Sequence, residues 1–128
     1  MRYLLLIYGD EKAWDDAGPD AIGQMMQEYD GFTKWLSASG ALVAAEALEP
    51  TNQATTVRVR DDQTMTTDGP FAETKEQLGG FYLLELGNLD EAIAWAKKIP
   101  MPGGTVEVRP VMDYESAGSA AHTSEAKA

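Results

Sequence analysis

The two strand-like segments at residues 2–8 and 80–86 constrain the fold of this chain more than any other feature. In both segments each alternating set of side chains is apolar, apart from Arg2 and Glu85. Successive side chains of a strand point to opposite faces of a sheet, so such a strand needs cover on both faces. Both segments are therefore predicted to be central strands of one domain, for which 128 residues are sufficient.

Turn residues and periodicity predict the other elements. Pro19 begins a helix that ends at Gly40, and Asn88 with Glu91 caps a second helix that stops before Pro100. Alternation and breaking residues predict further strands at 42–48, 54–60, 64–67 and 105–111. The resulting order of strand, helix, strand, hairpin, strand, helix, strand is an α+β, ferredoxin-like split βαβ with an inserted β-hairpin.

Several local expectations accompany this fold. The helices lie on one sheet face, and the stripes that they bury are predicted to include Met26 and Ile93. Residues 9–18 are expected to be an acidic loop, whereas 72–78 fit either a helical turn or an irregular loop. The domain is predicted to span 1–112, followed at 113–128 by a flexible tail of small and charged residues.

The second face of the sheet has no predicted cover within the chain. Two helices can cover only one face, and an apolar second face needs another layer. The sequence therefore predicts a twofold homodimer that packs sheet against sheet.

Composition excludes several kinds of partner and cofactor. The net charge is −11, with 21 acidic and 10 basic residues, so a phosphate backbone would be repelled and nucleic acid is not expected. The chain has no cysteine, and its one histidine, His122, lies in the tail, so no metal or haem cofactor is expected. Without a membrane-length apolar run or a signal peptide, we expect a cytoplasmic protein with no membrane partner.

Polar side chains on the main strands form the first candidate site. If the polar side chains of these strands all point to the helix-free face, they lie close together there. The candidates are Arg2, Tyr8, Glu46, Glu85 and Arg109, and alternation places Leu42 on the same face as Glu46. One interpretation is a polar pocket for a small ligand in the dimer cleft. The other is a set of ion pairs that fixes the register of the dimer.

The stretch 68–81 forms the second candidate site, because it begins with a Gly-Pro turn and then brings several charges together. Its candidate ligand-binding residues are Asp68, Phe71, Glu73 and Lys75. In a functional interpretation Asp68 or Glu73 acts as a general base, Lys75 anchors an anionic substrate and Phe71 forms a wall. Alternatively Asp68 closes the turn through its own backbone and the others form a solvated surface.

The run 67–84, which contains Asp-Gly-Pro-Phe at 68–71, and the segments 3–8 and 106–110 resemble the DGPF group of YCII-related proteins, which are small bacterial proteins. The likeness covers residues 1 to about 112 and implies a ferredoxin-like subunit in a dimeric α+β barrel. A shorter branch of the family carries a histidine and an aspartate as a candidate acid–base pair. Tyr29 and Ile99 take those positions here, so that pair is not implied.

The predicted function is binding of a small organic ligand in the dimer cleft, with or without turnover. One alternative is an accessory or regulatory protein that acts by protein contact, since many relatives are encoded beside extracytoplasmic-function sigma factors. Another is a cofactor-independent oxygenase or isomerase, by analogy with other dimeric α+β barrels. The sequence leaves open whether the protein is an enzyme.

Overall fold

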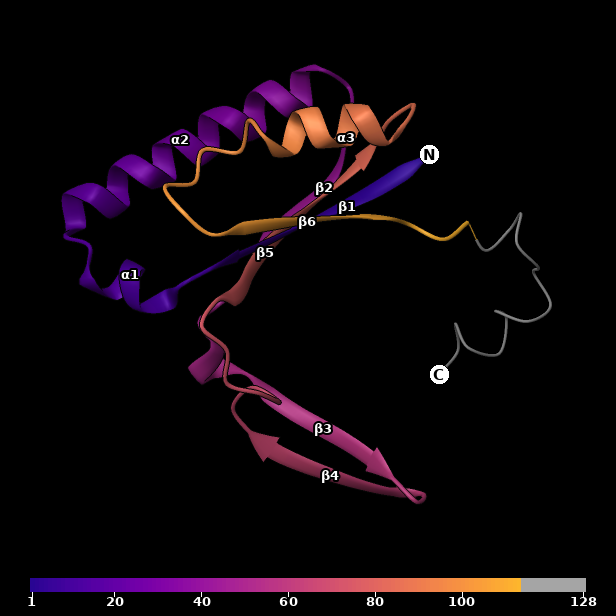
Figure 1. Cartoon of the computed structure of the whole chain (residues 1–128). Helices are drawn as coiled ribbons and strands as arrows, with labels where there is room; N and C mark the ends of the chain where they lie inside the picture. Colours follow the sequence, from indigo (N-terminus) through magenta and orange to yellow (C-terminus); the bar gives the residue numbers. More distant parts are fainter. Residues whose placement is uncertain (114–128) are drawn as a thin grey trace.

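The computed structural model describes residues 1–113, so the predicted tail, apart from Asp113, and His122 lie outside the described residues. The elements in chain order are β1 (Arg2–Gly9), α1 (Glu11–Asp16), α2 (Pro19–Ala38), β2 (Leu42–Ala47), the 3₁₀ helix η1 (Thr51–Gln53), β3 (Thr55–Arg60), β4 (Gln63–Asp68), β5 (Gln77–Glu85), α3 (Leu89–Ala96) and β6 (Thr105–Pro110) (Figure 1). Every predicted strand and both predicted helices are present, with ends shifted by a few residues.

Four strands form an antiparallel sheet in the order β2-β5-β1-β6. β1 and β5 are central, as their apolar sides predict. α2 and α3 lie together on one face of this sheet (Figure 1). The α+β, ferredoxin-like prediction is therefore confirmed, and β3 and β4 form a separate two-stranded sheet inserted between β2 and β5.

The core lies between the helices and the sheet. Its buried residues are Tyr3, Leu5, Phe32, Leu36, Ala41, Tyr82, Leu84, Ala92 and Ile99. Burying a large apolar side chain stabilises a fold by about 1.5–3 kcal/mol, so Leu5, Leu36 and Leu84 anchor this one. The predicted burial of Met26 and Ile93 is wrong. Met26 is 63% exposed because the buried residues of α2 are all in its C-terminal half.

The structure settles the expectations for the segments 9–18 and 72–78. The predicted loop after β1 contains α1, whose N-terminus is capped because the Asp10 carboxylate accepts a hydrogen bond from the Lys12 backbone N–H at 2.9 Å. Residues 69–76 form no helix and no strand, so the irregular-loop alternative holds. β5 then begins at Gln77, three residues before the predicted start at Gly80.

A β-bulge in β2 changes which residues share a face. The register shifts between Leu42 and Ala44, so Leu42 lies opposite Leu84 and packs on the core, while Glu46 lies opposite Phe81 on the other face. The expectation that Leu42 and Glu46 share a face is therefore wrong, because one inserted residue reverses the alternation of a strand.

The β3–β4 hairpin stands apart from the domain body. Its turn places Asp61 and Asp62 at φ values of 50° and 64°, the left-handed geometry of a tight hairpin turn. In Figure 1 the helices lie above the four-stranded sheet and the hairpin lies below it. The hairpin is therefore on the helix-free side.

Candidate functional site

The helix-free face has an apolar centre with polar side chains around it. Directly opposite residues of antiparallel strands point to the same face. One row across the sheet consists of Glu46, Phe81, Leu6 and Glu107, the next of Ala44, Leu83, Leu4 and Arg109, and Arg2 lies opposite Glu85. The apolar members Leu4, Leu6, Phe81 and Leu83 are only partly buried. The single chain thus leaves a broad apolar surface open.

A hollow lies at one edge of this face, at the end of β1 and the start of β6. It has a volume of about 470 Å³ and is lined by Tyr8, Glu76, Thr105, Val106 and Glu107, which define the β1–β6 hollow. The Thr105 hydroxyl donates a hydrogen bond to the Glu76 carboxylate at 2.8 Å. Glu76 therefore connects the stretch 68–81 to the sheet. The hollow offers two carboxylates, a phenol and a hydroxyl as hydrogen-bonding groups.

Glu85 does not join the β1–β6 hollow. Its carboxylate forms an ion pair with the N-terminal ammonium group of Met1 at 2.5 Å, and both groups are more than half exposed. A pair so exposed contributes about 0–1 kcal/mol to stability. Glu85 instead lines a second hollow of about 570 Å³ with Trp95 and Lys98, which we call the helix-end hollow.

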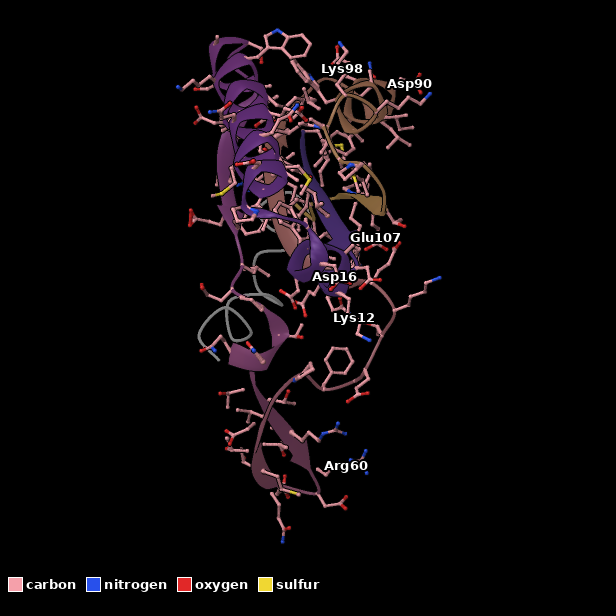
Figure 2. The ribbon with its side chains drawn as sticks, turned by 90° about the vertical axis from the view of Figure 1, so that its left-hand side faces the viewer. Lys12, Asp16, Arg60, Asp90, Lys98 and Glu107 are labelled. Carbon is pink, nitrogen blue, oxygen red and sulfur yellow. The ribbon has the colours of Figure 1, made fainter. Side chains whose placement is uncertain are left out.

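The two hollows lie at opposite ends of the sheet. Figure 2 shows Glu107 near α1, which carries Lys12 and Asp16, and Lys98 at the far end. In the helix-end hollow the Lys98 ammonium lies 5.0 and 5.1 Å from the ring centroids of Trp35 and Trp95. Among residues 1–113, Lys98 is the one basic side chain that lines that hollow, and it is engaged in these cation–π contacts.

The first half of the stretch 68–81 is fastened to the base of the hairpin. The Gly69 N–H donates to the Ala54 carbonyl at 2.7 Å, and the Thr56 hydroxyl donates to the Gly69 carbonyl at 2.7 Å. The Arg58 guanidinium donates to the Phe71 carbonyl at 2.9 Å. Gly69 has φ 95°, which explains a glycine at this turn.

The second half is fastened to α1 by a polar network that the sequence did not indicate. The Gln77 side chain accepts a hydrogen bond from the Glu11 N–H at 2.9 Å and donates one to the Thr74 carbonyl. The Glu11 carboxylate accepts from the backbone N–H and the hydroxyl of Thr51 at 2.8 and 2.7 Å. These partners are 40 and 66 residues apart, so no local pattern could have revealed them.

The structure does not bring the two predicted groups of site residues into one pocket. Asp68, Phe71, Glu73 and Lys75 are exposed, and none of them lines either hollow. Among the predicted sheet residues, Tyr8 lines the β1–β6 hollow, whereas Glu46 and Arg109 lie on the helix-free face outside it. Glu76 and Glu107 line the hollow but were not singled out as its binding residues.

The two positions that the family resemblance relates to an acid–base pair lie in or beside the core. Ile99 is buried, and Tyr29 packs against the core. Burial raises the pKa of the Tyr29 phenol, and the neighbouring Tyr82 raises it further. Tyr29 therefore stays a neutral phenol near neutral pH, consistent with a packing role.

Two further properties concern residues 1–113 only. In this part of the chain no three histidine, aspartate or glutamate side chains are grouped so as to hold a metal ion. None of its helices is both long and apolar enough to cross a membrane.

Comparison with known proteins gives two matches. A family model for the YCII-related domain matches residues 1–115. "Uncharacterized protein R00369" of Rhizobium meliloti (strain 1021) is 36% identical over 118 residues, which make up 90% of this chain and 95% of that relative. The family match includes the whole four-stranded sheet, the hairpin and every residue of the β1–β6 hollow.

Proposed function

Because this chain belongs to the family of YCII-related domain proteins, we propose that it is a cytoplasmic homodimer that binds a small organic ligand between the helix-free sheet faces. The Asp-Gly-Pro-Phe run at 68–71 supports its placement, as part of this proposal, in the DGPF group of the family. The cytoplasmic location rests on the sequence alone. The observation that supports binding is the open apolar face with the β1–β6 hollow at its edge.

The dimer is supported by the composition of the helix-free face. Leu4, Leu6, Phe81 and Leu83 form a continuous apolar group that the chain's own helices do not cover. Full burial of one large apolar side chain contributes about 1.5–3 kcal/mol. These four side chains are already partly buried, so completing their burial would stabilise an assembly by several kcal/mol in total. A second copy of the same face has the matching apolar character, and a twofold axis makes the contact self-complementary.

The lining of the β1–β6 hollow indicates the chemistry of the ligand. About 470 Å³ lies within the range of small-molecule pockets. Glu76 and Glu107 are hydrogen-bond acceptors when ionised, and no lysine or arginine from residues 1–113 lines the hollow. A ligand with amine or hydroxyl donors fits this set better than an anion held by Lys75, which lies outside the hollow.

The binding proposal is tested with a panel of small amines, guanidines and polyols, screened by NMR shifts of the Tyr8 and Thr105 amides. For any compound that binds, Glu76→Gln should weaken affinity by about 2 kcal/mol, since a partly desolvated donor loses its charged partner. Glu73→Gln is the matched control because Glu73 lies in the same stretch outside the hollow. Equal affinity in both variants would refute the hollow as the site.

Protein contact remains a second candidate function, because the helix layer exposes Trp35, Leu89 and Ile93. This candidate predicts that Trp35→Ala weakens binding to the partner protein, while ligand binding at the β1–β6 hollow is unchanged. An oxygenase or isomerase reaction rests on fold analogy, and none of residues 1–113 supplies an observation specific to it.

A further inference from the structure

The geometry points to the β3–β4 hairpin being an arm that packs on a second copy of this chain, an inference that rests on the proposed dimer. One face of the hairpin consists almost entirely of β-branched side chains: Thr55, Val57, Val59, Thr64 and Thr66, with Asp68 at its end. Val57 and Val59 are 58% and 71% exposed. Surfaces of this kind are typical of strands packed against another layer.

The hairpin lacks the support that would make it stable alone. Within residues 1–113 its two strands pair only with each other, and all residues of β3 and β4 except Thr56 are exposed. An isolated two-stranded hairpin is at best marginally stable in water and needs a third strand or another packing partner. Within residues 1–113 the exposed hairpin face has no such partner, and we infer that a second copy of the chain supplies it.

A second copy is the occupant that the arrangement favours. The hairpin lies on the helix-free side of the sheet, so a partner seated on that face would lie beside it (Figure 1). In a twofold dimer every contact occurs twice, so the hairpin of each subunit packs on the other subunit.

The area of the sheet face also favours a contribution from the arm. Four strands about 4.8 Å apart and about six residues long give a flat footprint of about 400 Å². A stable interface commonly buries about 800 Å² of accessible surface per partner. Even with corrugation the sheet face alone is small, whereas two arms would add about 200 Å² of footprint each.

Burial of the arm would also order the stretch 68–81. Thr56 and Arg58 of β3 hold the carbonyls of Gly69 and Phe71. Phe71 is 76% exposed in the single chain and lies next to the arm's base. An arm fixed by the partner therefore fixes the first half of this stretch as well.

Amide hydrogen exchange of residues 55–68 tests the inference in the full chain, comparing wild type with Leu6→Glu and Met26→Glu. Leu6→Glu places a charge on the helix-free face, and Met26→Glu places the same charge at an exposed position of α2. The hairpin does not pair with the main sheet, so Leu6→Glu removes no hydrogen bond of the hairpin itself, and unchanged circular dichroism is the control for the fold of the subunit. Exchange should be about tenfold or more faster in Leu6→Glu than in wild type and Met26→Glu.

The outcomes separate the arm from the dimer. Fast hairpin exchange in a wild-type dimer would overturn the arm inference and leave the sheet-to-sheet dimer in place. A monomeric wild type would overturn both. Slow exchange in a monomeric Leu6→Glu protein would show that the hairpin is stable alone, which also contradicts the inference.

A second pair of variants tests the packed face directly. Val57→Lys with Val59→Lys changes the β-branched face, whereas Gln63→Lys with Thr67→Lys adds the same charge to the opposite face of the hairpin. The first double variant should weaken dimerisation about tenfold or more, and the second should leave it nearly unchanged. Equal effects would overturn the assignment of the valine face to the partner.

Discussion

Gly79 and Gly80 are neighbours at the start of β5, but the structure constrains them differently. A Cβ atom at Gly80 would lie 2.8 Å from the backbone carbonyl oxygen of Glu46, whereas one at Gly79 would approach nothing closer than 3.9 Å. Backbone atoms of a paired strand cannot move aside cheaply. The sequence contains glycine at both positions, but only the pairing of β2 with β5 reveals which of the two is required.

Gly80→Ala should therefore lower the free energy of unfolding by about 1–3 kcal/mol, because the added methyl group pushes β2 away from β5. Gly79→Ala is the control and should change stability by less than about 0.5 kcal/mol. Urea denaturation of the two variants checks this. Similar losses in both would mean that the close approach of β2 is not a constraint.

Tyr82 links the sheet to α2, because its hydroxyl and that of Thr33 are 2.8 Å apart. Burial raises the pKa of the Tyr82 phenol above its ordinary value of 10.0, against the smaller opposing effect of the hydrogen bond. Above about pH 10 the unfolded chain releases phenolic protons that the folded chain still holds, so stability should fall as pH rises.

Tyr82→Phe should cost about 1 kcal/mol near neutral pH, through the lost hydrogen bond, and should make the alkaline fall in stability shallower. Denaturation between about pH 7 and pH 11 measures both effects. An unchanged alkaline slope would show that Tyr82 does not contribute to it.

At the scale of elements, the sequence predicted what local patterns determine. Asn88 caps α3 by accepting from the Glu91 N–H at 3.0 Å, as predicted, although the Glu91 carboxylate bonds the N–H of Gly87 and not that of Asn88. The sequence could not predict which side chains of β2 point to which face of the sheet. The bulge at Val43 decides this, and no residue type marks its position. Periodicity predicted the length of α2 but could not show that only its C-terminal half is buried, so Met26 was wrongly expected in the core.

The stretch 68–81 shows the same limit. Its turn at Gly69 follows from glycine and proline chemistry, but its anchors on Ala54 and Thr105 come from distant parts of the chain. Of the predicted binding residues only Tyr8 lines the β1–β6 hollow, because spacing along strands cannot show where a hollow forms.

The charges of this stretch lend themselves to a direct test. Within residues 1–113 the side chains of Glu73 and Lys75 form no hydrogen bond and no ion pair. Glu73→Gln with Lys75→Met should therefore shift stability by less than about 1 kcal/mol. Glu11→Gln, which weakens two acceptor contacts to Thr51, should cost about 1–2 kcal/mol. Thermal denaturation compares them, and the reverse order would contradict the described network.

At the scale of the whole molecule, the doubly apolar strands predicted both the sheet order and the need for a second layer. β1 and β5 are central and covered by α2 and α3 on one face only. The alternation of β3 is readable in the sequence and places its valines on one face of the hairpin. The sequence could not show that the hairpin lies on the helix-free side, because that depends on how β2 leads into β3. A dimer would cover both surfaces.

The mass of the protein in solution tests this proposal most directly. Light scattering coupled to size-exclusion chromatography, at micromolar concentration, should give twice the 13.9 kDa of one chain for wild type and for Met26→Glu. Leu6→Glu should give the single-chain mass with unchanged circular dichroism, because its charge would be buried in the interface. A wild type at 13.9 kDa, or a Leu6→Glu protein that stays dimeric, would contradict the sheet-to-sheet dimer and the cleft built on it.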